Sequence, residues 1–71
     1  MTFPYDDQGE QLPDGWHRWP TRLYPVQYHH EAARKFVAPY GERWGYGTLG
    51  RSMFEGNCAT REEAMEEAAS L

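Results

Sequence analysis

Phe36, Ala38 and Tyr40 alternate with Lys35, Val37 and Pro39 in the middle of the chain, which is the period of a β-strand. In residues 35–40, KFVAPY, every second side chain points to the same face. A Gly-Glu pair then supplies a two-residue turn before residues 43–48, so these two stretches are expected to form a hairpin. Gly50 permits a further turn into a short third strand around residues 52–54.

The C-terminal residues 61–71 instead show the spacing of a helix. Thr60 and Glu63 form a capping box, in which the threonine hydroxyl accepts from the glutamate amide and the glutamate carboxylate reaches back to the threonine amide. The residues that follow are good helix formers. Small and apolar residues recur at three- and four-residue spacing and form a narrow stripe that can lie on a sheet: Ala64, Met65, Ala68 and Leu71.

Residues 24–38 fit two kinds of element. Tyr24, Val26 and Tyr28 alternate as in an edge strand, where the intervening proline is tolerated. Tyr28 also stands at helical spacing from Ala32, within a stretch of high helix propensity. A strand is the preferred interpretation, and a helix remains the alternative.

The first twenty residues are expected to form an irregular acidic arm, because proline and glycine recur throughout them. Trp16 and Trp19 should pin the end of this arm to the core, since two tryptophans in water would form an adhesive patch. The chain is thus divided into an arm, residues 1–20, and a single domain, residues 21–71. The predicted fold class is α+β: a small antiparallel sheet of three to four strands with one C-terminal helix packed on it.

The sequence GYGTLG at residues 45–50 matches the glycine fingerprint of nucleotide-binding loops. That pattern works only where a helix begins directly after it, so that backbone amides and the helix dipole converge on the phosphates. No helix signal precedes Thr60. We therefore assign these glycines to the hairpin.

Charge is segregated along the 71 residues, although the total is only −4. Residues 1–15 carry a net charge of −4, residues 16–54 carry +4, and residues 55–71 carry −4. Such blocks predict surface patches of opposite sign, unless the acidic ends fold back onto the basic middle. A single cysteine and the lack of a long apolar run favour a cytoplasmic protein without a membrane segment.

The titratable residues show no arrangement typical of an enzyme. His29 and His30 are adjacent and would point to opposite faces of a strand, so they cannot serve one site. Cys58 precedes the helix, where the dipole could lower the pKa of its thiol, but a small core residue is the preferred interpretation. No catalytic residue, metal site or cofactor is expected.

Two binding hypotheses follow. In the first, the chain is a non-enzymatic protein-binding module that docks on a larger protein or nucleoprotein complex through aromatic anchors and an acidic helix face. Its candidate residues are Glu62, Glu63, Glu66, Glu67, Tyr40, Trp44 and Tyr46.

In the second hypothesis, the basic middle binds single-stranded nucleic acid, with Trp44 or Tyr46 stacking on bases. Protein binding is favoured because the acidic ends would repel phosphate. Pairing of two copies into a homodimer is also considered. The candidate phosphate contacts are Arg34, Lys35, Arg43 and Arg51.

Three stretches carry a resemblance to known small domains: residues 36–39, residues 44–46 and residues 59–64. Their order resembles uncharacterised bacterial and phage domains in which a tryptophan-bearing hairpin precedes a T-x-x-E-A helix. In size, acidity and strand-then-helix order, the chain is also similar to small phage-encoded accessory proteins such as anti-CRISPRs and other inhibitors of host machinery. The resemblance implies an inhibitor or adaptor, located in the host cytoplasm if the chain is phage-encoded. No single motif defines that group, so it carries no site residues.

Overall fold

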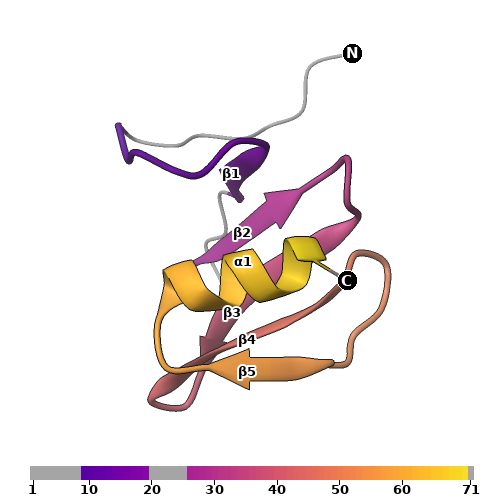
Figure 1. Cartoon of the computed structure of the whole chain (residues 1–71). Coiled ribbons are helices and arrows are strands. Elements are labelled where there is room, and N and C mark those ends of the chain that lie inside the picture. The colour runs from indigo at the N-terminus through magenta and orange to yellow at the C-terminus, as the bar shows by residue number, and fades with distance from the viewer. Residues whose placement is uncertain (1–8, 20–25, 71) are drawn as a thin grey trace.

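The strands form one antiparallel sheet in which each strand pairs with the next along the chain, and a helix lies across one face (Figure 1). This computed structural model describes residues 9–19 and 26–70. The elements are β1 (Trp16–Trp19), β2 (Gln27–His30), β3 (Lys35–Tyr40), β4 (Arg43–Thr48), β5 (Gly56–Cys58) and α1 (Arg61–Ser70).

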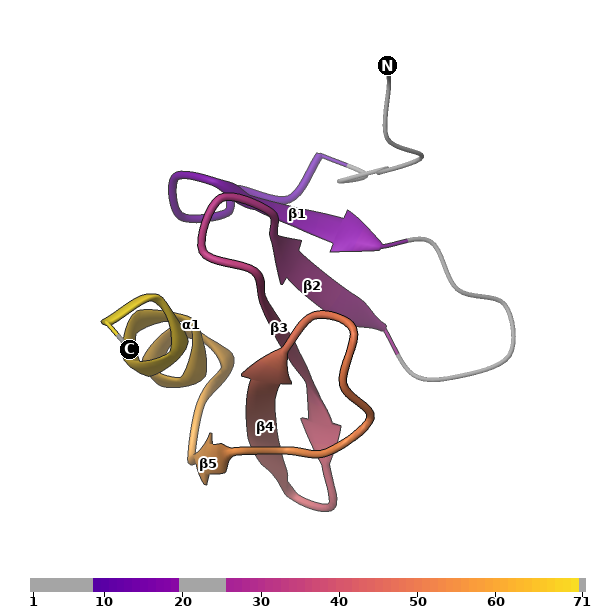
Figure 2. The ribbon, with the colours of Figure 1, turned by 90° about the vertical axis from the view of Figure 1, so that its right-hand side faces the viewer.

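The strand register sorts the side chains onto two faces. Tyr28 pairs with Val37, and Val37 pairs with Tyr46, so these three side chains share one face. They are buried there against the helix residues Ala64 and Met65. The intervening residues point to the other face of the sheet. Figure 2 shows that the segment between β4 and β5 lies on this side, opposite α1.

The helix begins at Arg61, as predicted. The Glu63 amide donates to the Thr60 hydroxyl at 3.1 Å, which satisfies one of the amides that the first helical turn leaves free. Ala64, Met65 and Ala68 form the buried face, and the two alanines let the helix approach the sheet closely. Leu71, the last member of the predicted stripe, lies outside the described residues.

The α+β class, the antiparallel sheet and the C-terminal helix are confirmed, but the predicted number of strands is wrong. The sheet has five strands because residues 16–19, assigned to the irregular arm, pair with β2 as β1. The last strand is also later than predicted, at Gly56–Cys58 in place of residues 52–54. Residues 52–54 are not part of the sheet, because Phe54 folds back over the face opposite α1. Its ring packs there against the rings of Phe36 and Tyr40.

The ambiguous stretch at residues 24–38 is resolved in favour of strands. β2 ends at His30, and a turn over residues 31–34 leads into β3, so the helical alternative is wrong. Arg34 adopts a φ of 58° in this turn. Tyr24 and the proline after it lie outside the described residues.

The two tryptophans of β1 lie on opposite faces of the sheet. Trp16 is buried in the core, as predicted, and its ring meets that of His30 edge-on. Trp19 instead stacks on His29, with ring centroids 5.0 Å apart. The prediction that neighbouring histidines point to opposite faces is therefore confirmed.

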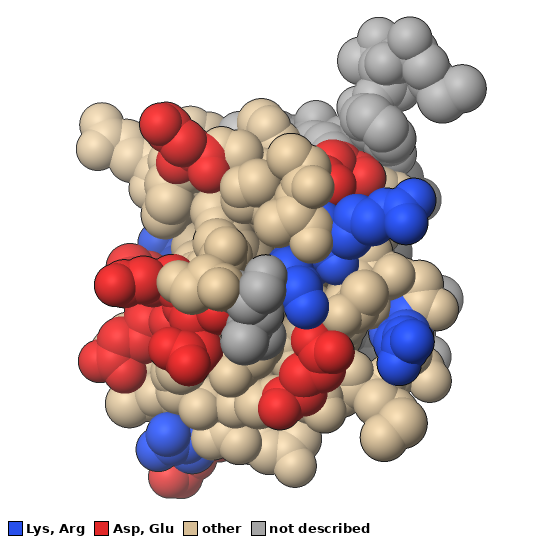
Figure 3. All heavy atoms as spheres, turned by 45° about the vertical axis from the view of Figure 1, so that its right-hand side comes forward, with Lys and Arg blue, Asp and Glu red and all other residues tan. Residues whose placement is uncertain are grey.

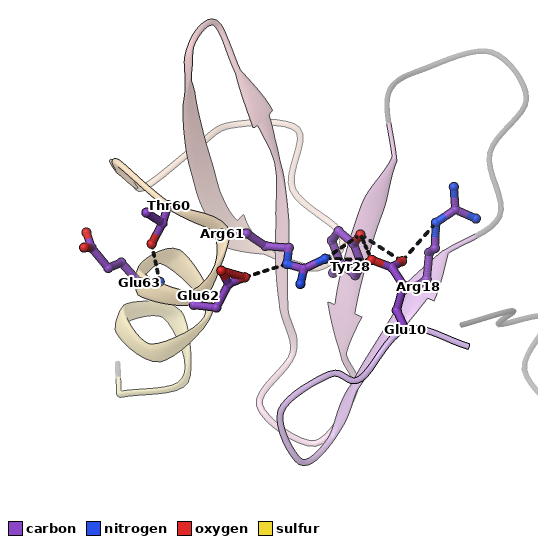
Figure 4. Close-up of polar contacts among 7 residues, drawn as sticks. All are labelled: Glu10, Arg18, Tyr28, Thr60, Arg61, Glu62 and Glu63. Atoms are coloured by element: carbon purple, nitrogen blue, oxygen red, sulfur yellow. Dashed lines mark hydrogen bonds and ion pairs between the residues drawn. The ribbon is translucent and has the colours of Figure 1, made fainter. Parts of the chain in front are cut away.

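A polar cluster joins the N-terminal segment to β2 and the helix (Figure 4). The Glu10 carboxylate accepts from Arg61 Nη1 at 2.7 Å and from the Tyr28 hydroxyl at 3.0 Å. Arg18 adds an ion pair at 3.5 Å, and the Arg61 guanidinium lies 5.0 Å from the centroid of the Tyr28 ring. One carboxylate thus connects three elements that are distant in sequence.

This cluster makes the stability depend on pH. Burial raises the pKa of Glu10, but hydrogen bonds from Arg61 and Tyr28 and the charges of Arg61 and Arg18 outweigh it, so the pKa lies below its ordinary value of 4.5. A lowered pKa in the folded state means that the stabilisation is complete above the unfolded-state pKa. It is lost as the pH falls through the folded-state pKa.

We predict that Glu10→Gln lowers the free energy of unfolding by about 1–2 kcal/mol at pH 7, because the charge-assisted hydrogen bonds are weakened. The difference from wild type should shrink as the pH falls below about 4, where the wild-type carboxylate becomes protonated. Urea unfolding at pH 7, 5 and 3 measures both effects. Glu66→Gln, on the exposed side of the helix, is the matched control and should differ little from wild type. A Glu10→Gln deficit that stays constant across this pH range would contradict the assignment.

Candidate functional site

The residues predicted to bind a protein partner are divided between the two faces of the sheet. The four glutamates are exposed on α1, but Tyr46 is only 9% exposed beneath that helix and Trp44 is half-buried beside the core. Tyr40, which is 49% exposed, points to the opposite face. The predicted site is therefore not assembled as one surface. The glutamates are Glu62, Glu63, Glu66 and Glu67.

The residues predicted to contact phosphate are also in different environments. Lys35 Nζ is held at 3.0 Å by both the Thr48 hydroxyl and the Glu55 carboxylate. Arg43 is exposed, and its Nε donates to the Asn57 side chain at 2.6 Å. Arg34 and Arg51 are exposed as well. Lys35 thus has an internal structural role, and the three arginines present their side chains to solvent.

An aromatic cluster occupies the sheet face opposite α1, which we call the uncovered face. Phe54, from the segment between β4 and β5, lies 5.6 Å from the Phe36 ring and 4.9 Å from the Tyr40 ring, centroid to centroid. Tyr40, Met53 and Phe54 are 49%, 73% and 38% exposed, and they are the exposed large hydrophobic residues among those described. Large apolar side chains are thus concentrated on this side.

The strand glycines explain how this segment can approach the sheet. A Cβ atom on Gly45 would overlap the Phe54 ring, and one on Gly47 would lie 2.8 Å from Phe36 Cε1. These glycines leave room for two aromatic rings directly above the backbone. The assignment of the GYGTLG glycines to the hairpin is confirmed, since the segment after Gly50 leads to a strand and not to a helix.

A groove of about 530 Å³ lies beside the aromatic cluster. Its floor comes from β2 and β3, and residues 49–52 form one wall. The Leu49 amide donates to the Arg34 carbonyl at 2.8 Å and ties this wall to the turn between β2 and β3. The lining residues are Gln27, His29, Phe36, Ala38, Leu49, Gly50, Arg51, Ser52 and Phe54.

The electrostatic character of the groove is weakly positive. Arg51 is the charged residue among the described lining residues. Burial lowers the pKa of His29 more than the nearby Glu31 raises it, so this imidazole is neutral at pH 7. In Figure 3, acidic side chains gather on the side of α1, and most of the basic side chains in view lie toward the other side.

Cys58 packs against the core and is not in the setting of a reactive thiol. Burial raises the pKa of the Cys58 thiol, and Glu67 and Glu63 raise it further, so this cysteine is a packing residue and not an activated nucleophile.

Among the residues that the structure describes, no three His, Cys, Asp or Glu side chains are grouped to hold a metal ion. In that same part of the chain, no helix is long and apolar enough to cross a bilayer.

Sequence reasoning did not single out the residues that line the groove, apart from Arg51. Phe54 was assigned to a strand, and Phe36 was considered only as part of an alternating pattern. The available signal was the pair Met53-Phe54, which stands in an otherwise polar segment after a strand with glycines at alternate positions. Such glycines leave a face bare, and nearby aromatic residues can cover it.

Comparisons with protein-family models, with curated proteins and with solved structures gave no significant match.

We predict that Gly45→Val destabilises the protein by about 1–3 kcal/mol, because the new side chain displaces the Phe54 ring. Strand propensity alone would make Gly45→Val stabilising, since valine is favoured over glycine in strands. In a Phe54→Ala background the steric conflict is removed, so the cost of Gly45→Val should fall clearly below its cost in the wild type. Urea unfolding of the four proteins measures this coupling. Additive costs would show that Phe54 does not pack over Gly45.

Proposed function

We propose that this chain is a small, non-enzymatic protein-binding module of the inhibitor or adaptor type. It docks on a larger protein or nucleoprotein complex through the uncovered face of the sheet. The observation that carries this proposal is the exposed cluster of Tyr40, Met53 and Phe54 beside an apolar groove. Contiguous exposed apolar residues mark interaction surfaces, and aromatic residues supply much of the binding energy at their centres.

The helix face is the less favourable docking surface. It presents four carboxylates, but the aromatic residues nearest to it, Trp44 and Tyr46, are already packed against the core. A purely acidic face gives steering and specificity more than affinity. We therefore retain Tyr40 as an anchor from the sequence-based set and add Met53 and Phe54. The sequence resemblance to small phage-encoded inhibitors supports a role on host machinery.

Two properties of the uncovered face and the net charge of the chain favour a protein partner. The Tyr40 and Phe54 rings meet at 63°, so each covers part of the other and neither is a free platform for a base. Met53, the most exposed of the three, has no ring to stack. The net charge of −4 also opposes binding to phosphate.

Binding of single-stranded nucleic acid is the second candidate function. It is supported by the exposed side chains of Arg34, Arg43 and Arg51, the last of which lines a groove with aromatic walls. A mobility shift with unpaired oligonucleotides across a salt series tests it. Micromolar binding that weakens steeply with salt would favour this function over protein binding.

We expect a photocrosslinking amino acid at position 53 to capture a larger protein from a lysate of the host cells, and the same group at position 67 to capture none. Met53 and Glu67 are both exposed, so the two variants differ mainly in the face that they report on. In unlabelled competitors, Met53→Ser should weaken competition about tenfold, as expected for an apolar anchor, and Glu67→Gln should leave it unchanged.

Mass spectrometry of the adducts identifies the captured chain. Capture at position 67 alone would move the docking surface to the helix and contradict the proposal. Adducts between two copies of this chain alone would replace it with a homodimer.

A further inference from the structure

The groove on the uncovered face also specifies the kind of segment that it accepts, an inference that rests on the proposed function. We propose that it binds an extended, acidic segment of the partner protein. One apolar side chain of that segment enters the groove and packs against the Phe36 and Phe54 rings, and a flanking carboxylate pairs with Arg51.

The groove has room for a large apolar side chain, and its lining supports such a side chain as the anchor. Its volume, about 530 Å³, falls within the range of about 300–1,000 Å³ that is typical of ligand pockets. Phe36, Ala38, Leu49 and Phe54 supply the apolar part of the lining. Burial of an aromatic or long aliphatic group in the groove is therefore favourable, and a small polar group would gain little binding free energy there.

The sign of the charge around the groove determines what flanks that anchor. Arg51 lines the groove and is exposed. The ion pairs among the described residues use Arg18, Lys35 and Arg61 as their basic partners, and Arg51 takes part in none of them. Glu55 is a competitor for Arg51: hydrogen bonds from Lys35 and Thr48 lower the pKa of this carboxyl group, and the charges of Lys35 and Arg51 lower it further. That carboxylate is already held by Lys35 Nζ and the Thr48 hydroxyl, each at 3.0 Å.

No carboxylate is among the described residues that line the groove. Arg43 lies on the same face, where it pairs with Asn57, and Arg34 stands next to the groove wall through its bond to Leu49. The exposed glutamates of α1 lie on the opposite face and repel an acidic partner there. An acidic segment is thus repelled by one side of the molecule and attracted to the other.

The shape of the site favours an extended segment over a helix. The wall over residues 49–52 contains Gly50 and Ser52, which bring the backbone close to the groove with little side-chain bulk. Gln27 and Ser52 line the same groove. The Gln27 Oε1 atom already contacts His29 Nε2 at 3.2 Å, so the Gln27 amino group and the Ser52 hydroxyl are the groups suited to main-chain atoms of an extended peptide.

A pool of nine-residue peptides with a central phenylalanine and randomised flanks tests the inference directly. Peptides retained by the immobilised wild-type protein should be enriched in Asp and Glu at the flanking positions. Arg51→Glu should abolish this enrichment or shift it toward Lys and Arg, while Glu67→Gln should leave it unchanged. For a retained acidic peptide, Arg51→Gln should weaken binding about two- to fivefold at low salt, and less at high salt, as expected for an exposed ion pair.

Amide chemical shifts of the ¹⁵N-labelled protein locate the bound peptide. Changes at Phe36, Leu49 and Phe54 are expected, and changes confined to α1 would overturn the inference. Equal retention of acidic and basic flanks, or the same enrichment with Arg51→Glu, would also overturn it. Binding of an unlabelled oligo-dT of nine nucleotides in place of the acidic peptides would overturn the inference as well. If crosslinking at position 53 still captures a partner in any of these cases, the proposed function stands and only the acidic-segment inference fails.

Discussion

A ten-residue helix can cover only one face of a five-stranded sheet, and this limit determines how the rest of the molecule is arranged. On the helix side, small residues of α1 seal Tyr28, Val37 and Tyr46 into a core. On the other side, the segment between β4 and β5 is the part of the described chain that lies over the strands. It leaves Tyr40 and Phe54 partly in solvent. In the described part of the chain, the core and the proposed docking face are therefore two consequences of the same limited cover over the sheet.

The elements that have local signals could be predicted from the sequence. The capping residues around Thr60 set the start of the helix, and the alternation in residues 35–48 set the central hairpin. β1 was missed because it is four residues long and follows sequence rich in proline and glycine. Its identity as a strand depends on pairing with β2, which is a tertiary contact.

The candidate site was harder to predict than the fold. Alternation places Trp44 and Tyr46 on a common face, but it does not tell which face the helix will cover. That choice rests on contacts between α1 and residues far away in the sequence, so the two aromatic residues were predicted as anchors and are packed against the core. The charge blocks of the sequence also predicted the surface charge only in part. Glu10 folds back onto Arg18 and Arg61, and Glu55 onto Lys35, so part of the segregated charge is neutralised internally.

The order of the strands has a consequence for how the chain folds. Every strand pairs with its neighbour in sequence, so the sheet can form hairpin by hairpin with short loop closures. A topology dominated by such local contacts is expected to fold quickly for an antiparallel sheet. The contact between Glu10 and Arg61 spans 51 residues and requires both the sheet and the helix. It is expected to close last, so weakening it should accelerate unfolding more than it slows folding.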